Sequence, residues 1–143
     1  MNLDAIVGAW PVRAAVAVIG PTGTLISSGD CDVVRRFASV TKPIAVLGIL
    51  DAVHAGELDL DEPAGPEGST LRHLLAHSSG LNFDDDRQLA AAGTRRIYSN
   101  RGIETAGEFF QKRTGVPLAR RVHERILTPL GMRDTELNGS PAK

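Results

Sequence analysis

The apolar positions near the amino terminus predict a β-hairpin. Residues 12–20 form a β-rich apolar run, and residues 20–23, Gly-Pro-Thr-Gly, have the composition of a tight turn. An extended pattern resumes over residues 24–28, which would form the returning strand. Residues 33–37 have the composition of a third short strand, so we expect residues 1–38 to form a hairpin-and-strand segment.

From Ser39 onward the apolar positions recur with helical spacing. The first helix is predicted to begin at Ser39, with Pro43 in its first turn and Gly56 just beyond its end. Its apolar residues follow i, i+3, i+4 and i+7 spacing at Val46, Ile49, Leu50 and Val53. Because Ile44 and Leu47 are apolar as well, this helix is predicted to be buried nearly all round.

Further helices are predicted downstream. Residues 71–76 form a short one after a loop rich in Pro and Gly, and residues 102–113 form a longer one. Residues 117–127 form the last predicted helix, with Pro117 in its first turn. Its spacing places three apolar side chains inward: Leu118, Val122 and Ile126.

These elements indicate an α+β chain, with the hairpin segment at residues 1–38 and a predominantly helical lobe over residues 39–143. A length of 143 residues is enough to bury one core. A net charge of −1 argues against a nucleic-acid partner. Cys31 is the single cysteine, so no internal disulfide is expected and a reducing compartment is favoured. The apolar run at residues 14–19 is too short for a membrane span or a secretion signal, so we expect a cytoplasmic protein without a membrane partner.

Ser39 and Lys42 are the strongest candidates for chemistry. They lie three positions apart at a helix start, so both side chains fall on one face. A serine hydroxyl is a weak nucleophile until a neighbouring group takes its proton. Lysine with its ordinary pKa near ~10.4 is charged at neutral pH, so two schemes are open. Either burial makes Lys42 a neutral base, or a charged Lys42 holds Tyr98 as a phenolate that acts as the base.

The residues Ser39-Val-Thr-Lys42 and Tyr98-Ser-Asn100 resemble, in this order, two motifs of the serine β-lactamase and penicillin-binding protein superfamily. The likeness is greatest to the branch of class C β-lactamases, DD-peptidases and esterases. Other segments match along the chain, at residues 58–63, 71–81, 93–100 and 126–132. The likeness extends over essentially the whole chain and implies a β-lactamase/transpeptidase-like α+β fold.

The resemblance implies a serine hydrolase that needs no metal or organic cofactor. Ser39 would carry the acyl group, and Lys42 and Tyr98 would form the base system. Asn100, whose amide has one acceptor and two donors, would bind Lys42 and a substrate amide. The substrate would be a small β-lactam, a D-amino-acid peptide or an ester, and the expected cytoplasmic location favours esters or small amides.

Members of the superfamily carry a third motif, Lys-Thr-Gly or His-X-Gly, on a strand that lines the other wall of the cleft. Residues 112–115, Lys-Arg-Thr-Gly, lie at a predicted helix end and are not that motif. We therefore expect residues 1–143 to be the truncated N-terminal part of one β-lactamase-like domain, without the C-terminal strands. Two alternatives stay open: a catalytically silent binding module, or half of a split enzyme that self-associates or takes a complementing half through an open sheet edge.

Two other groups invite different chemistry. His77, beside Ser78 and Ser79, suggests a Ser-His-Asp site, but the resemblance places this segment in a structural turn where the histidine packs or caps. The aspartates at residues 84–86 suggest a metal site by composition. Because three consecutive carboxylates point in different directions, a solvated loop or helix start is the favoured interpretation.

Overall fold

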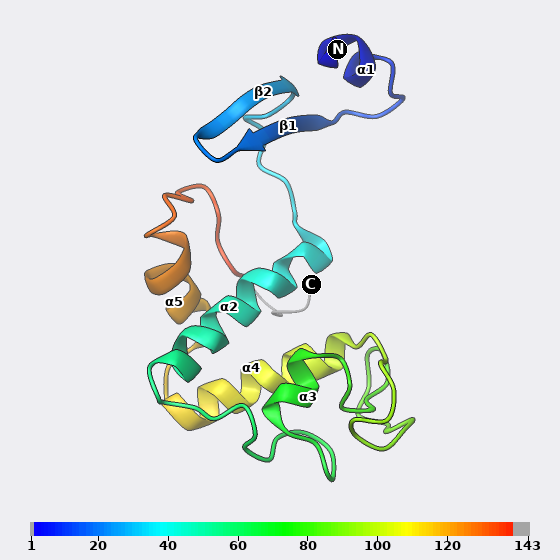
Figure 1. Cartoon of the computed structure of the whole chain (residues 1–143), viewed down its shortest axis with the longest axis vertical. Helices are drawn as coiled ribbons and strands as arrows, with labels where there is room; N and C mark the ends of the chain where they lie inside the picture. Colours follow the sequence, from blue (N-terminus) through cyan, green and yellow to red (C-terminus); the bar gives the residue numbers. More distant parts are fainter. Residues whose placement is uncertain (1, 139–143) are drawn as a thin grey trace. The chain divides into compact units, whose positions relative to one another are not determined.

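The computed structural model describes residues 2–138 (Figure 1). Its internal contacts divide the chain into two compact units, residues 1–36 and residues 37–143. The first unit contains the hairpin, and the second contains the helical lobe together with Ser39, Lys42, Tyr98 and Asn100. Within the described part of the chain, no helix is long and apolar enough to cross a lipid bilayer.

The predicted hairpin is present in the first unit. β1 (Ala15–Gly20) pairs antiparallel with β2 (Gly23–Gly29), and a bulge interrupts the register after Val18. Gly23 has a φ of 124°, a conformation that side chains rarely allow, so this turn requires glycine. A short helix that the sequence analysis did not anticipate, α1 (Leu3–Gly8), precedes the hairpin.

α1 packs on β2 and gives the first unit a small core. Leu3 and Val7 of the helix are buried. The hydroxyl of Ser28 donates a hydrogen bond to the Asp4 carboxylate at 2.5 Å. Asn2 caps the helix, because its side chain accepts the Ala5 N–H at 3.1 Å. This cap stabilises a helix of only six residues.

The third strand predicted over residues 33–37 is wrong, because this segment is irregular in the structure. The Arg35 guanidinium donates to the carbonyls of Asp30 and Val33 at 2.7 and 3.1 Å. The Val33 N–H donates to the same Asp30 carbonyl at 3.3 Å. These local bonds occupy backbone groups that a strand would offer to a neighbour.

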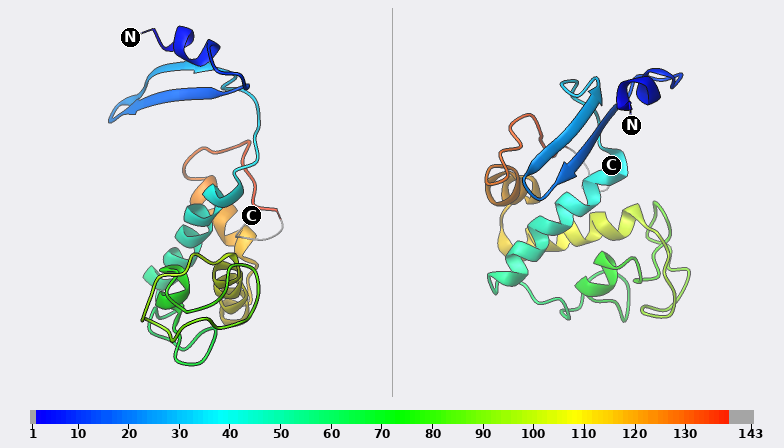
Figure 2. Two further views of the ribbon diagram at one scale, coloured as in Figure 1. Left: turned by 90° about the vertical axis from the view of Figure 1, so that its right-hand side faces the viewer. Right: turned by 45° about the horizontal axis from the view of Figure 1, so that its top comes forward.

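The second unit is built from helices joined by loops. In chain order its helices are the 3₁₀ turn η1 (Ala38–Val40), α2 (Thr41–His54), α3 (Leu71–Leu75), α4 (Asn100–Thr114), α5 (Leu118–Val122) and the π-turn η2 (His123–Leu127). α2 packs against α4 and α5, and α3 packs against α4 (Figure 2). Each helix predicted after residue 38 is therefore present, although Ser39 lies in η1 rather than at the start of α2, and α4 begins two residues earlier than predicted.

The core of the second unit lies where these helices meet. Its buried apolar side chains are Ala45, Ile49, Ala52, Leu58, Ala64, Leu71, Leu74, Leu81, Ala106, Phe110, Leu118, Val122 and Leu127. Gly48 brings α2 close to α5, because an added Cβ would lie 2.7 Å from Cγ2 of Val122. Small residues on α2 thus set the distance between these two helices.

α2 is not buried all round, so that prediction is wrong. Its buried positions form a stripe that consists of Thr41, Lys42, Ala45, Gly48, Ile49 and Ala52. Leu47 and Leu50, on other faces, are 47% and 38% exposed. The core of the second unit covers this stripe and, in part, Ile44 and Val53 beside it, so the apolar composition of α2 did not predict which of its faces would stay exposed.

The last helix changes geometry halfway along. Pro117 is the residue before α5 rather than part of its first turn, and α5 leads directly into η2. In η2 the Thr128 N–H donates to the carbonyl of His123, five residues earlier, at 3.0 Å. A π-turn holds more residues than an α-turn, so the following positions rotate about the axis. Leu127 is consequently buried, whereas Ile126, which was predicted to face inward, is only partly buried.

Ion pairs connect α2 with α5 and η2. Arg121 contacts the carboxylates of Asp51, at 3.0 Å, and Glu57, and Arg125 contacts Asp51 at 3.3 Å. The Arg121 and Asp51 side chains are only 13% and 18% exposed. This cluster closes the side of the core at which α2 ends.

We expect Asp51→Asn to lower the free energy of unfolding by about 1 kcal/mol. The hydrogen bond from Arg125 is the largest cause that holds the pKa of Asp51 below 3.8. The contribution of this carboxylate is therefore present above the unfolded-state pKa and is lost as the pH falls through the lower folded-state value. Urea unfolding of both chains from neutral to acidic pH checks this: their difference should vanish at the acidic end, and a constant difference would contradict the assignment.

Candidate active site

Ser39 and Lys42 lie next to each other at the start of α2. Ser39 belongs to η1, and Lys42 follows in the first turn of α2. Nζ of Lys42 donates a hydrogen bond to Oγ of Ser39 at 3.2 Å. Lys42 is only 5% exposed, whereas Ser39 is exposed. The amine is thus held within the protein while the hydroxyl remains accessible to a reactant.

The backbone just before Ser39 is strained. Ala38 has a φ of 48°, in the left-handed region that glycine favours. A residue in such a conformation carries about 1–3 kcal/mol of strain, which the surrounding structure must offset. The Val40 N–H donates to the Phe37 carbonyl at 3.0 Å and closes the turn that holds Ser39. The position of the serine is therefore fixed by its backbone.

Tyr98 brings a phenol to the Ser39–Lys42 pair from the loop before α4. Nζ of Lys42 lies 4.9 Å from the centroid of the Tyr98 ring. The hydrogen bond from Lys42 is the largest cause that lowers the pKa of Tyr98 below 10.0, and the hydrogen bond from Ser39 is the next. Burial opposes these two hydrogen bonds, and the positive charges of Lys42 and Arg96 lower the pKa of Tyr98 by smaller amounts. The structure therefore brings together three of the four predicted site residues in direct contact.

Asn100 is the first residue of α4 and is 6% exposed. Its Nδ2 donates to the Asp84 carboxylate at 2.8 Å. Its Oδ1 is buried and has no hydrogen-bond partner among residues 2–138, so the contact with Lys42 that the resemblance implied is not made by this oxygen. The bond to Asp84 thus orients the Asn100 amide with Nδ2 toward the carboxylate. Oδ1 is then the buried acceptor, on the residue two positions after Tyr98.

Ser99 has a structural function that the motif alone did not reveal. Its Oγ accepts the Gly102 N–H at 2.8 Å and donates to the Asn82 carbonyl at 2.6 Å. Ser99 is thus the N-cap of α4 and fixes the loop that carries Tyr98. The preference of serine for N-cap positions is the sequence signal that would have found it.

His77 does not assemble a Ser-His-Asp site with the serines beside it. Its Nδ1 accepts the Ser99 N–H at 3.2 Å. Ser78 donates its hydroxyl to the His73 carbonyl at 3.4 Å, and Ser79 is buried at 1% exposure. The imidazole therefore packs and accepts a backbone hydrogen bond, as the resemblance implied for this turn.

The aspartates at residues 84–86 point to different partners. Their side-chain donors are Asn100 for Asp84, Asn82 for Asp85 and Arg101 for Asp86. Within residues 2–138, no three His, Cys, Asp or Glu side chains are grouped so that they could hold a metal ion. Each carboxylate instead anchors the loop that leads to α4.

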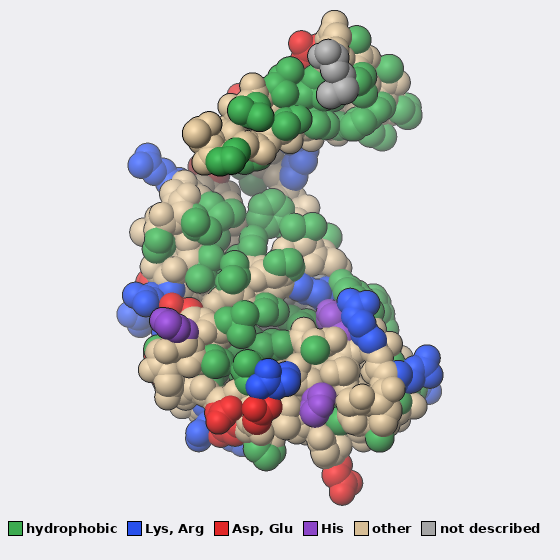
Figure 3. Space-filling model, viewed as in Figure 1, with side chains coloured by type: hydrophobic (Ala, Val, Ile, Leu, Met, Phe, Trp, Pro, Cys, Tyr) green, Lys and Arg blue, Asp and Glu red, His purple; other side chains and the backbone are tan. Residues whose placement is uncertain are grey.

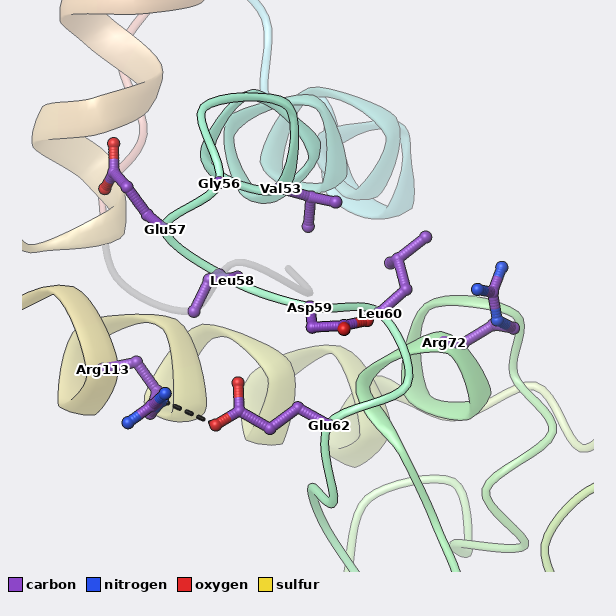
Figure 4. A pocket seen from close by; sticks show the side chains of 9 residues that line it. All are labelled: Val53, Gly56, Glu57, Leu58, Asp59, Leu60, Glu62, Arg72 and Arg113. Atoms are coloured by element: carbon purple, nitrogen blue, oxygen red, sulfur yellow. Dashed lines mark ion pairs between the residues drawn. The ribbon is translucent and has the colours of Figure 1, made fainter.

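A hollow of about 600 Å³ lies elsewhere in the second unit, along the segment that follows α2 (Figure 4). Leu58 and Glu62 line it, and an ion pair of 2.8 Å joins Glu62 to Arg113 of α4. None of the four predicted site residues belongs to its lining. The hollow is therefore separate from the Ser39 cluster.

The family model for β-lactamases matches residues 14–143. The chain therefore belongs to the β-lactamase family, which confirms the resemblance drawn from its motifs. The β-lactamase/transpeptidase-like α+β fold is confirmed as well, since a crystal structure of a β-lactamase from Mycobacterium bovis superimposes with a TM-score of 0.91. That protein is 49% identical, and the match covers 96% of this chain and 51% of that chain.

Two curated relatives have names that describe acyl chemistry. Esterase EstB of Burkholderia gladioli is 35% identical over 72% of this chain, and the match covers 38% of that protein. The acyltransferase calJ of Penicillium decumbens is 32% identical over 69% of this chain, with 26% of that protein covered. The chain therefore spans well under half the length of these curated relatives and about half the length of the M. bovis protein.

Proposed function

We propose that this chain carries the nucleophile and the base of a serine hydrolase that cleaves carboxylic esters through an acyl-enzyme on Ser39. The observation that supports it most is the contact of Ser39 with Lys42 and Tyr98, in which an accessible hydroxyl meets a buried amine and a phenol of lowered pKa. Such a nucleophile paired with a base is the arrangement that covalent catalysis needs.

The proposed reaction has two steps. Oγ of Ser39 attacks the ester carbonyl carbon, its proton passes to the base, and the base returns a proton to the leaving alcohol as the C–O bond breaks. A water molecule then attacks the Ser39 ester and gives up a proton to the base. The carboxylic acid leaves, and Ser39 regains its proton.

Tyr98 is the base in this proposal, and Lys42 stays charged. Lys42 donates to Ser39 and lowers the pKa of Tyr98. A cation that donates to both oxygens favours the phenolate over the phenol, and the phenolate takes the serine proton. This choice selects the second of the two schemes that the sequence left open.

An ester is the preferred substrate class because the two curated relatives are an esterase and an acyltransferase. A β-lactam or a D-amino-acid peptide would react by the same two steps. In this proposal Oδ1 of Asn100, which lacks a hydrogen-bond partner within residues 2–138, accepts an amide N–H of such a substrate once the buried amide becomes accessible. We further propose that an oxyanion donor from a third-motif strand completes the site, supplied by a further segment or by another polypeptide.

The second candidate function is binding without turnover, through the first unit. β1 and β2 form a two-stranded sheet, and such a sheet is marginal in water and offers unpaired edges. Figure 3 shows hydrophobic side chains gathered on the unit that contains this sheet. Its exposed large apolar residues include Ile6, Trp10, Val18, Ile19, Leu25 and Ile26. A complementing half or a second copy of the chain would cover them.

The proposal is tested by incubating the chain with a fluorophosphonate probe, a fluorescent penicillin and a p-nitrophenyl ester, followed by intact-mass analysis. The Ser39→Ala variant is the test, and Ser27→Ala, which changes an exposed serine of β2, is the matched control. We expect adducts on the wild-type and Ser27→Ala chains and none on Ser39→Ala. An adduct on Ser39→Ala, or a folded wild-type chain that no reagent modifies, would overturn the assignment and favour the binding function.

A further inference from the structure

His77 occupies the position after α3 where helices usually place glycine. The Ser78 N–H donates to the His73 carbonyl at 2.8 Å, and the His77 N–H donates to the Leu74 carbonyl at 3.2 Å. This pair of bonds is the Schellman arrangement, and its left-handed residue is His77, with a φ of 56°. Because a side chain in this conformation is strained, the backbone alone gives no reason for a histidine here.

The side chain and the carbonyl of His77 hold the segment that carries Tyr98 from both sides. The Ile97 N–H donates to the His77 carbonyl at 2.8 Å. The Ser99 N–H donates to Nδ1 of His77 at 3.2 Å. Between these two bonds the imidazole lies against the Tyr98 ring, with a centroid distance of 4.6 Å. His77 thus contacts the tyrosine and both of its neighbours in the chain.

We propose that His77 is the positioning residue for Tyr98 and acts as an uncharged hydrogen-bond acceptor. The proposal rests on the proposed function of Tyr98 as the base. Orientation of the base matters because a displacement of about 1 Å in a catalytic group can reduce the rate by about 10²-fold. The contacts with Ile97 and Ser99 fix the backbone, and the ring contact fixes the phenol relative to Lys42 and Ser39.

The acceptor role defines the charge of the imidazole. A peptide N–H only donates, so Nδ1 carries a lone pair and the proton of the neutral ring is on Nε2. The cations that act on this ring are Lys42 of α2 and Arg96 of the preceding loop, and the phenol of Tyr98 faces it. Burial is the largest cause that lowers the pKa of His77, and the two positive charges add to it. Protonation of Nδ1 would replace the bond to Ser99 by a clash of two donors.

Two substitutions separate positioning from folding. His77→Gly suits the left-handed backbone, so the chain should fold, but it removes the acceptor and the ring. His77→Asn also tolerates this backbone and places Oδ1 near the former position of Nδ1, without a group that titrates. His54→Asn, at an exposed position in the last turn of α2, is the control.

Tyr98 is the single tyrosine of the chain, so tyrosinate absorbance near 295 nm reports its ionisation alone. In His77→Gly we expect the pKa of Tyr98 to rise toward about 10 and the rate of fluorophosphonate acylation to fall by about 10²-fold. His77→Asn should restore the wild-type pKa of Tyr98 and the wild-type acylation rate. In the wild type, protonation of His77 at acidic pH should slow acylation, and this contribution should be absent from His77→Asn. His54→Asn should match the wild type throughout.

Two results would overturn the positioning role. One is a folded His77→Gly chain with an unchanged Tyr98 titration and acylation rate, and the other is a failure of His77→Asn to restore either quantity. A wild-type chain that resists acylation would contradict the proposed function instead. In that case the Tyr98 titration alone decides whether His77 positions the phenol.

Discussion

Replacement of Lys42 by methionine should slow the acylation of Ser39 by about 10²–10⁴-fold, the range that a positioned proton-transfer system contributes. In the proposed scheme Lys42 donates to the nucleophile and stabilises the Tyr98 phenolate. Methionine has a similar length and no charge, so both effects disappear while the space stays filled. Because Lys42 is only 5% exposed, removal of its amine also relieves the unfavourable desolvation of a buried charge. Stability should therefore be maintained while reactivity is lost.

The measurement combines two readouts on the same variant. Intact-mass kinetics with a fluorophosphonate give the acylation rate, and tyrosinate absorbance gives the pKa of Tyr98, which should rise toward its ordinary value near 10. Lys112→Met is the matched control because Lys112 is exposed near the end of α4. If Lys42→Met kept the wild-type rate, the base system would have to be sought elsewhere. If the rate fell but the Tyr98 titration did not move, Lys42 itself would be the base.

Local sequence predicts only one of the contacts in the candidate site, that between Ser39 and Lys42. Ser39 and Lys42 are three residues apart, so helical geometry alone predicts that they meet. Tyr98 joins them from 56 residues beyond Lys42 in the sequence, and no periodicity connects these positions. The tyrosine was placed by the resemblance, because its location depends on the loop between α3 and α4, which forms from side-chain contacts rather than from a repeating pattern.

That loop also explains what the sequence did not predict. Three hydrogen bonds of this segment join residues 16 to 22 positions apart: Asn100 to Asp84, Ser99 to the Asn82 carbonyl, and the Ser99 N–H to His77. The resemblance assigned roles to Tyr98 and Asn100, whereas it gave His77 only as a residue that packs or caps. The hydrogen bonds that join His77 to Ile97 and Ser99 have no counterpart in a local sequence pattern.

The fold shows the same division between local and tertiary information. The hairpin and the helices were predicted because turn residues and apolar spacing are local signals. The predictions that were wrong depend on tertiary contacts. The face of α2 that is buried depends on where α4 and α5 lie, and the π-turn after α5 changed which of Ile126 and Leu127 faces the core. The irregular segment at residues 33–37 results from an arginine side chain that binds nearby carbonyls.

Phe110→Ala should have the largest effect on stability, about 3–5 kcal/mol. Phe110 is fully buried in the middle of the core of the second unit, and the Arg121 guanidinium lies 5.7 Å from its ring centroid. Removal of the ring leaves a cavity between α4 and its neighbours, because packed helices collapse only partly around such a gap. Small domains are stable by about 5–15 kcal/mol, so this loss is a large fraction of the total.

Urea unfolding followed by far-UV circular dichroism checks this prediction. Phe109→Ala is the matched control, since it removes the same side chain from the neighbouring position of α4, where the ring is only partly buried, and it should lower the stability less. Trp10 is the single tryptophan and lies in the first unit, so its fluorescence follows that unit separately. Equal destabilisation by the two alanine variants would contradict the assignment of Phe110 to the core.

The same variant connects the core to the site. α4 begins at Asn100, with Ser99 as its cap and Tyr98 immediately before it, so the helix that Phe110 anchors also carries the base and the buried amide. α2, which α4 contacts, carries Lys42 and follows the turn η1 that contains Ser39. We therefore expect the Phe110→Ala chain to lose Ser39 acylation at urea concentrations where its α-helical signal is lost. A chain that stayed reactive after its helices had unfolded would show that reactivity does not require the contact of α2 with α4.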